Sequence, residues 1–396
     1  MGKKALFIFL ILAVAAGTVF SRDYRLDDQK AEDLAGIDTV IFDMGGISCA
    51  LCIRTMEVSG TITGGGRGSR LELGLTGEVT SNRREAVPAL YTERQGRTLK
   101  IRLFPREQTF FGLSQSGTAR FTGVLPDSFR GEVKISSSSG DLTAENLAVR
   151  SLLMEASSGD VRVSGVRADL ISADLSSGNL TAGELEAREE LELHSSSGGM
   201  TLGRLQARGR MDIQISSGHI AADSLSGGEV FIHSSSGRIR ADRLEARRGI
   251  LEISSGDVTL GTLSGGEMSI DQSSGRLKIQ RLEAERLEIE TSGDVEILSG
   301  RGELICRGSS SDVTVTLDSL EDQVDVDVSS GNVELTLPEK ASFSLSMETS
   351  SGRILSDFPV LGIPDGKTNR LRGTVNGGGP EVRLETSSGS ISLRAD

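Results

Sequence analysis

The sequence predicts an all-β fold, a parallel β-helix or solenoid with coils of about 19 residues. The phrase Ser-Ser-Gly, followed by a polar residue and alternating apolar residues, recurs between Gly140 and Gly389, and most successive glycines lie 19 or 20 residues apart. A fixed period of this size is the signature of a solenoid. No proline occurs between Pro126 and Pro338. This absence suits strands that are paired on both edges, because proline cannot donate to a ladder.

Each coil is expected to contain two strands joined by turns. In the coil that opens at Gly237, the inward positions are Ile239, Ala241 and Leu244, and a second alternating pair follows at 251 and 253. Period-two alternation predicts strands with one buried face. Residues 183–193 favour a helix by their own propensity, but the equivalent stretch of another coil contains two glycines. We therefore expect strand, turn and strand there as well.

The Ser-Ser-Gly phrase itself is interpreted as a structural corner. Glycine permits a positive φ or a close backbone approach at the bend. The serine hydroxyls can bond to one another and to the backbone of the turn.

Composition and charge narrow the class of protein. The 396 residues include 49 glycines and no Trp, and aromatic residues make up only 4%, which indicates small residues stacked in register. The formal net charge is -13. We expect no nucleic-acid partner, because phosphate contacts require a positive surface.

The N-terminus predicts export from the cytoplasm. Lys3 and Lys4 precede an apolar run over residues 5–19, and Val-Phe-Ser at 19–21 places a small residue just before the expected cleavage site. This pattern is typical of a signal peptide over residues 1–21, with cleavage after Ser21. The alternative is an uncleaved anchor, although the run is shorter than the roughly 20 apolar residues of a spanning helix. The expected location is extracytoplasmic: periplasm, cell surface or secreted.

The remaining chain divides into four predicted segments. Residues 22–36 are charged and indicate a linker or a short helix. Residues 37–130 predict an irregular β region that caps the array, with SGTI at 59–62 and SGTA at 116–119 as degenerate copies of the phrase; a separate β-domain is the alternative. Residues 131–352 are predicted to form the regular solenoid, and 353–396 a C-terminal cap or an inserted loop, with one last strand that returns to close the array. Such ends protect unpaired strand edges.

Cysteines are the first candidates for chemistry. Cys49 and Cys52 form a lone C-x-x-C, which is open to a structural disulfide, to redox chemistry or to two plain thiols. Cys306 takes the inward position that Ile289 fills one coil earlier, so we expect it to pack as a small hydrophobe.

The other candidate sites also favour structural interpretations. His194 and His233 share a column but lie two coils apart, about 10 Å, which is too far to share one metal ion. His219 lies in the column that follows the glycines, where basic residues interrupt the aspartates and argue against a calcium ladder. The glycine-rich residues 64–68 lack the spacing of a phosphate loop and are interpreted as a turn. We therefore expect no catalytic, cofactor-binding or metal-binding residues, and no cofactor.

The ending RGTVNGGGPEVRLETSSGSISL, at residues 372–393, follows coils of the Ser-Ser-Gly-Asp-Val type and an N-terminal leader. Together these features resemble the bacterial putative-adhesin family of β-strand-repeat proteins, a domain family of unknown function, over residues 37–396. The resemblance implies an extracytoplasmic, right-handed, single-stranded β-helix-like fold. It brings no catalytic residues with it.

These observations favour a non-catalytic protein of the cell envelope or surface, an adhesin or a binding scaffold. The partner would be an envelope, surface or extracellular protein or glycan, with membrane contact only through an uncleaved N-terminal segment; self-association is left open. One alternative is an envelope-stress regulatory component that acts through a membrane partner. A glycan-active β-helix enzyme is disfavoured, because such enzymes use converging carboxylates and aromatic platforms for sugar rings.

Overall fold

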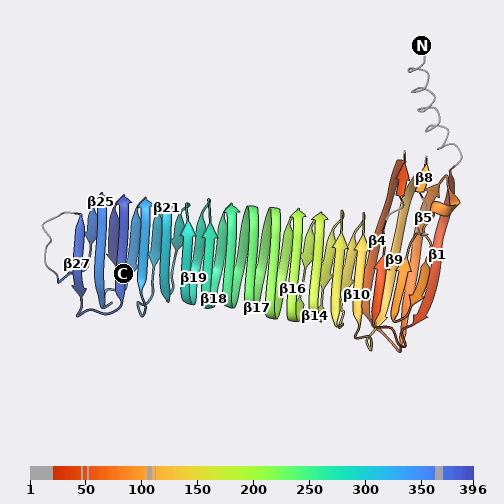
Figure 1. The fold of residues 1–396 in the computed structure, drawn as a ribbon, viewed down its shortest axis with the longest axis horizontal. Coiled ribbons are helices and arrows are strands. Elements are labelled where there is room, and N and C mark those ends of the chain that lie inside the picture. Colours follow the sequence, from red (N-terminus) through yellow and green to blue (C-terminus); the bar gives the residue numbers. More distant parts are fainter. Residues whose placement is uncertain (1–20, 46–47, 51–52, 105–108, 112, 362–368) are drawn as a thin grey trace, which may run out of the picture. The chain divides into compact units, whose positions relative to one another are not determined.

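Almost all regular structure in this chain is extended strand (Figure 1). The computed structural model describes residues 21–45, 48–50, 53–104, 109–111, 113–361 and 369–396, without the side chains of 48–50, 53–55 and 109–111. The predicted signal peptide lies outside these residues. In the described part of the chain, no helix has the length and apolar character needed to span a bilayer. The chain divides into two units, Met1–Arg188 and Glu189–Asp396.

The regular part of the first unit is a parallel array with a 19-residue step. Glu132 aligns with Ser151, and Ser151 aligns with Leu170, so each strand pairs with its equivalent in the next coil. The strands are β10 (Glu132–Ser137), β11 (Leu142–Glu145), β12 (Ser151–Ala156), β13 (Val161–Ser164), β14 (Val166–Ser177) and β15 (Leu180–Ala182).

The same parallel ladders continue into the irregular N-terminal part of this unit. β2 (Thr39–Asp43) pairs with β10, and β4 (Ile53–Gly66) pairs with β11. β7 (Thr98–Arg102) and β9 (Ser114–Pro126) add the next coil on β2 and β4. A larger core fills this region, where the rings of Phe42 and Phe121 lie 5.7 Å apart.

Antiparallel strands then end the array. β5 (Arg70–Ser81) pairs with β9, β1 (Arg22–Asp33) with β5, and β6 (Tyr91–Gln95) with β7. A separate short pair joins β3 (Ser48–Ala50) to β8 (Thr109–Phe111). One turn of 3-10 helix, η1, spans Arg84–Ala86.

Two sequence expectations for this unit were wrong. Residues 22–36 are no linker or short helix, because β1 covers most of them and pairs along its length with β5. The phrases SGTI and SGTA are not corner copies. Gly60 aligns with Leu142, two residues beyond the corner glycine, and Gly117 lies two residues before the residue that aligns with Val58. A local match in sequence did not establish the register.

In the second unit one long strand runs through the corners at Gly218 and Gly237, and the strands after it end at each later corner. The strands of this unit are the end of β16 (Leu185–Ser197), then β17 (Met200–Ser255), β18 (Val258–Gln272), β19 (Leu277–Thr291), β20 (Val295–Ile297), β21 (Glu303–Ser310), β22 (Val313–Thr316), β23 (Val324–Ser330) and β24 (Val333–Leu337). Residues 185–193 of the stretch 183–193, which favours a helix locally, lie in strand β16 as predicted, but without the turn that was predicted between two strands.

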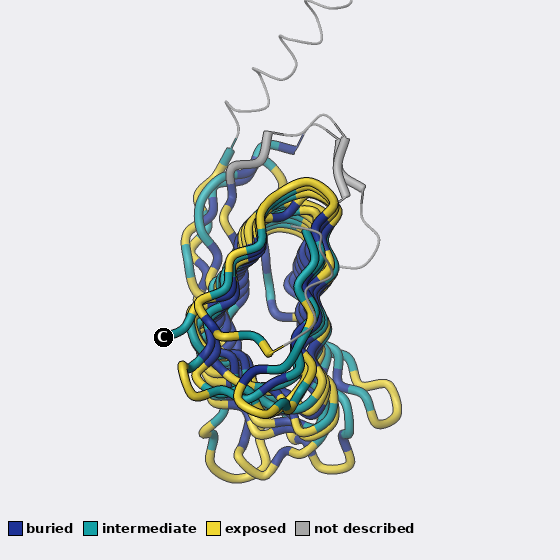
Figure 2. Tube along the Cα trace, turned by 90° about the vertical axis from the view of Figure 1, so that its left-hand side faces the viewer, coloured by how far each residue is buried: buried dark blue, intermediate teal, exposed yellow. Residues whose placement is uncertain are grey.

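The predicted inward positions are buried. Ile239, Ala241 and Leu244 are at most 1% exposed, and Leu251 and Ile253 at most 2%. Figure 2 shows buried residues on the inside of the coils and exposed residues at the turns. Each coil is too thin to bury its apolar face alone, so stacking supplies the core.

The C-terminal end contains β25 (Phe343–Ser351), β26 (Ile354–Ser356), β27 (Arg370–Val375), β28 (Glu381–Ser388) and β29 (Ile391–Ala395). The expectation of one last strand that closes the array was wrong. Two strands return, β28 and β29, and they pair with β23 and β24 on one side and with β25 and β26 on the other.

Three sets of contacts build the Ser-Ser-Gly corner. At Gly237 φ is +128°, and an added Cβ would lie 1.5 Å from the carbonyl oxygen of Gly218 in the preceding coil. The second serine of the phrase staples the coils together: the hydroxyl of Ser236 donates to the carbonyl of Ser216 at 3.4 Å. The equivalent hydroxyl of Ser255 donates to the carbonyl of Ser235 at 3.3 Å.

The acidic residue after the glycine supplies the third contact. The Oδ1 atom of Asp312 accepts the backbone N–H of Asn332 in the next coil at 2.7 Å. Asp141 and Asp257 accept from the next coil in the same way. These aspartates therefore act as coil-to-coil acceptors.

Candidate binding groove

A groove of about 520 Å³ follows the Ser-Ser-Gly corner of the second unit. Its lining is polar and combines three kinds of group. Carboxylates come from Asp271, Glu290 and Asp327, a guanidinium from Arg307, and hydroxyls from Ser273, Ser292, Ser309 and Ser329.

Strand register places these groups side by side. Asp271 aligns with Glu290, Glu290 with Arg307, and Arg307 with Asp327. Side chains at aligned positions of parallel strands leave the same face about 4.8 Å apart. The serines follow two residues later on each strand, so they form a second column on that face.

The groove carries a negative charge that its own basic residue does not neutralise. Arg307 donates to Asp325, at 2.5 Å to Oδ2 and 3.3 Å to the carbonyl oxygen. Within the described residues, the carboxylates of Asp271 and Glu290 form no hydrogen bond or ion pair. Like charges at aligned positions repel each other, so a cation or a hydrogen-bond donor in the groove would relieve that repulsion.

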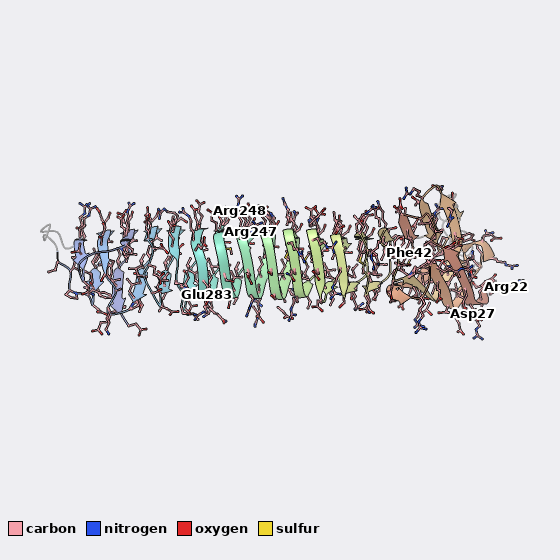
Figure 3. All side chains as sticks on the ribbon, turned by 90° about the horizontal axis from the view of Figure 1, so that it is seen from below. Arg22, Asp27, Phe42, Arg247, Arg248 and Glu283 are labelled. Atoms are coloured by element: carbon pink, nitrogen blue, oxygen red, sulfur yellow. The ribbon has the colours of Figure 1, made fainter. Side chains whose placement is uncertain are left out.

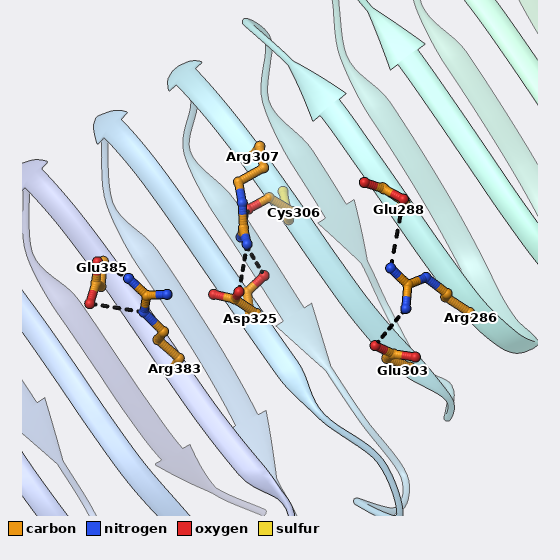
Figure 4. Close-up of polar contacts among 8 residues, drawn as sticks. All are labelled: Arg286, Glu288, Glu303, Cys306, Arg307, Asp325, Arg383 and Glu385. Carbon is orange, nitrogen blue, oxygen red and sulfur yellow. Dashed lines mark hydrogen bonds and ion pairs between the residues drawn. The ribbon is translucent and has the colours of Figure 1, made fainter.

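Beside the groove lies an ion-pair network on the same outer face (Figure 4). Arg286 contacts Glu303 at 3.0 Å and Glu288 at 3.9 Å, and Arg383 contacts Glu385 at 2.8 Å. Hydrogen bonds to Glu385 and Asp325 raise the pKa of Arg383 and Arg307 respectively. Asp325 is only 8% exposed at its side chain, so Arg307 keeps a buried carboxylate paired.

Charge alternates along a third column, in contrast to the groove. Arg248 aligns with Glu267, Glu267 with Arg286, and Arg286 with Glu303. Figure 3 shows Arg247 and Arg248 of β17 projecting outward. Each charge in this column has opposite charges on its neighbours, so the column is close to neutral.

The first unit contains an equivalent groove of about 340 Å³. Its carboxylates are Glu155 and Asp174, which are aligned partners in neighbouring strands. Its serines are Ser136, Ser137, Ser138, Ser157 and Ser176. The same two columns therefore form a groove in each unit.

The structure places Cys306 as the sequence predicts. It is fully buried opposite Ile289 and Val326. Burial raises the pKa of its thiol to about 12, so the thiolate is not populated at neutral pH. Cys49 is described only by its backbone in β3, and Cys52 lies outside the described residues. Their redox state therefore stays a prediction.

Two of the three histidines contact separate carboxylates. His233 Nδ1 lies 3.0 Å from Glu252 Oε2, and His194 Nε2 lies 4.0 Å from Asp212 Oδ1. Among the residues that the structure describes, no group of three or more His, Cys, Asp or Glu side chains is placed to hold a metal ion. Residues 64–68 cover the end of β4 and the turn into β5, where the N–H of Gly65 donates to Asp127.

Sequence reasoning missed the groove. A signal for it was present in the sequence. Asp271 and Glu290 occupy the same outward position in two consecutive coils, just before the Ser-Ser-Gly or Ser-Gly corner of each coil. The sequence alone gave no reason to expect ligand binding at this column and not at the nearly neutral column of Arg248, Glu267, Arg286 and Glu303.

The sequence matches the profile of the Toastrack DUF4097 family over residues 50–243 and 226–394. The chain belongs to the Toastrack family. These two segments cover most of the array, including all the residues that line the grooves except Gly45. No curated protein matches the chain.

Three solved structures resemble this Toastrack chain. A putative cell adhesion protein from Clostridium sporogenes is 10% identical, with 94% of this chain and 100% of that chain covered and a TM-score of 0.21. A putative adhesin from Parabacteroides merdae is 13% identical, with 78% of this chain and 96% of that chain covered and a TM-score of 0.24. A putative lipid binding protein from Parabacteroides distasonis is 13% identical, with 93% of this chain and 96% of that chain covered and a TM-score of 0.19.

Proposed function

We propose that this Toastrack protein is a non-catalytic binding scaffold of the bacterial cell envelope or surface, which holds an extended ligand in its corner grooves. The observation that carries the proposal is the recurrence of one groove in both units, built from the same carboxylate and serine columns. A ligand with repeating hydroxyl or cationic groups, such as a glycan or a protein segment, could bond to several coils in succession.

The geometry of the carboxylates supports binding more than catalysis. Asp271 and Glu290 project from aligned positions of neighbouring strands, on one face and in one direction. Glycoside hydrolysis requires two carboxyl groups that flank the scissile bond, one of them held protonated. Parallel carboxylates in a column are arranged to contact one side of a ligand.

The predicted leader over residues 1–21 supports a location outside the cytoplasm. Protease shaving of intact cells, with an antibody against the array, tests this part of the proposal. We expect the array to be digested on intact cells or after the outer envelope is opened. Digestion only after the cytoplasm is released would contradict an extracytoplasmic location.

A charge-neutralised groove tests the binding part. In the double variant Asp271→Asn with Glu290→Gln, we expect sedimentation with isolated cell envelopes to weaken at least several-fold. The matched control, Glu245→Gln with Glu267→Gln, removes the same charge from exposed positions outside the groove. An equal loss in both variants would show that net charge, and no particular groove, governs binding.

A further inference from the structure

Coil order at the C-terminal end departs from chain order. Earlier in the second unit, each coil pairs with the coil that follows it in sequence, as β18 does with β19 and β19 with β20 and β21. The coil of β28 and β29 instead lies between two coils that the chain forms earlier, those of β23 with β24 and of β25 with β26. Figure 1 shows the C-terminus inside the array, with β25 and β27 beyond it.

Residues 343–396, here called the C-terminal module, hold together as one body. β25 is paired on one edge with β27 and on the other with β28, and β26 pairs with β29. Among the described residues, strands of the module pair with the rest of the unit only through β28 on β23 and β29 on β24. These two strand pairs, here called the docking ladder, lie on one edge of the module and attach all of it.

Residues 338–342, here called the linker, are the covalent connection. Glu339 and Lys340 are exposed, and the linker begins with the first proline after Pro126. Because β28 and β29 occupy the next position in the array, the linker must pass over them. It crosses two strand spacings, about 10 Å, between Leu337 and Phe343.

We infer that the C-terminal module exchanges between two copies of this chain, with β28 and β29 of one copy docked on β23 and β24 of the other. The docking ladder is identical within a chain and between chains, as in other domain-swapped proteins. The equilibrium between docking within one chain and docking on a second chain is therefore set by the linker, because the linker determines the effective concentration of the module near its own docking site. This exchange is independent of the groove and of its ligand.

Exchange of β28 and β29 alone is disfavoured. Their removal would break ladders on both edges, and the side chains of Val382, Leu384, Ile391 and Leu393 are fully buried between the flanking coils. Exchange of the whole module breaks the ladder on one edge only. It also keeps intact the turn at 376–380, which leads from β27 to β28 across the start of β25.

Linker length is the sharpest variable for a test. The native linker allows six Cα–Cα steps between Leu337 and Phe343, or about 21 Å when extended. Deletion of residues 339–341 leaves three steps, about 11 Å, which barely equals the axial distance and leaves nothing for the path around the inserted coil. Docking within one chain then becomes impossible, and only a second copy can supply the module.

Engineered disulfides report which chain supplies the module. Glu334 and Ser392 are aligned partners in β24 and β29, across the docking ladder. Glu334→Cys with Ser392→Cys, in a Cys49→Ser and Cys52→Ser background, spans neighbouring strands at a separation that suits a disulfide. With the native linker at micromolar concentration we expect a link within one chain. In the shortened-linker chain we expect covalently linked dimers on a non-reducing gel.

A matched control uses Thr314→Cys with Glu334→Cys, aligned partners in β22 and β24 that both lie outside the module. Its disulfide should stay within one chain whatever the linker. The inference is overturned if the control gives as much linked dimer as the reporter pair, which indicates random collision. It is equally overturned if the shortened-linker chain is a monomer with an intrachain link.

A second measurement avoids any folding defect of the shortened chain. Two differently tagged full-length copies with the native linker and the reporter cysteines are unfolded together and refolded at concentrations up to about 1 mM, near the effective concentration of a short linker. We expect disulfide-linked species that carry both tags, in a fraction that rises with concentration. Refolding without mixed species at any concentration would refute exchange.

Discussion

Replacing Gly237 with Ala is expected to destabilise the corner in two ways, through backbone strain and through a steric clash with the preceding coil. The backbone there has a φ of +128°, and an L side chain in such a conformation costs about 1–3 kcal/mol. The new Cβ would also lie 1.5 Å from the carbonyl oxygen of Gly218. Ordinary carbon–oxygen contacts are about 3.3–3.6 Å, so one coil must move away from the other.

That movement opens the ladder at the corner. Hydrogen bonds between these two coils, such as the hydroxyl of Ser236 to the carbonyl of Ser216 at 3.4 Å, lie next to it. Each such bond contributes about 1 kcal/mol net. With two bonds lost and the backbone cost added, we expect the free energy of unfolding of the second unit to fall by about 4 kcal/mol.

Gly377→Ala is the matched control. Its φ is +93°, but no heavy atom lies within 4 Å of an added Cβ, so only the backbone cost of about 1–3 kcal/mol applies. Urea unfolding followed by far-UV circular dichroism compares the two variants, and hydrogen exchange shows whether the loss is local to the corner, as solenoids allow. If Gly237→Ala destabilises the protein no more than Gly377→Ala does, the close-approach argument is wrong.

Three further predictions follow from individual contacts. Asp312→Ala should lower the free energy of unfolding by about 1 kcal/mol in urea titrations, because it removes an acceptor for the next coil; Arg276→Asn, which adds an acceptor to that column, should raise it slightly. Burial raises the pKa of the Cys306 thiol to about 12, so above pH 9 the unfolded chain loses a proton that the folded chain keeps. Stability should therefore fall by about 1.4 kcal/mol per pH unit between pH 9 and 12, a slope that Cys306→Val should lack. Arg307→Ala should cost about 2 kcal/mol by leaving Asp325 unpaired, and a double-mutant cycle with Asp325→Asn should show coupling between the two residues.

The sequence by itself determined the repeat, and within the regular coils it determined the strands and their buried face. The reason is that these properties are local and recur thirteen times, so errors in one coil are corrected by the others. Ile239 and Leu244 were assigned inward from spacing alone, and stacking overrode the helical propensity of residues 183–193. The corner glycine was likewise predictable, because positive φ and close approach are both requirements that glycine alone meets easily.

Only the tertiary structure decided which residues become neighbours where the period fails. SGTI at 59–62 resembles the corner phrase, yet Gly60 pairs two residues away from the corner, because ladder register depends on the partner strand. The groove depends on Asp271 and Glu290 lying side by side while Arg307, the next residue of the column, pairs with Asp325, which is a property of columns across coils. The insertion of β28 and β29 is decided in the same way. The sequence gives no preference between two positions for the coil of β28 and β29: at the end of the array, or between the two coils that precede it in the chain. Both positions bury the same apolar face. Only the length and path of residues 338–342 decide between them.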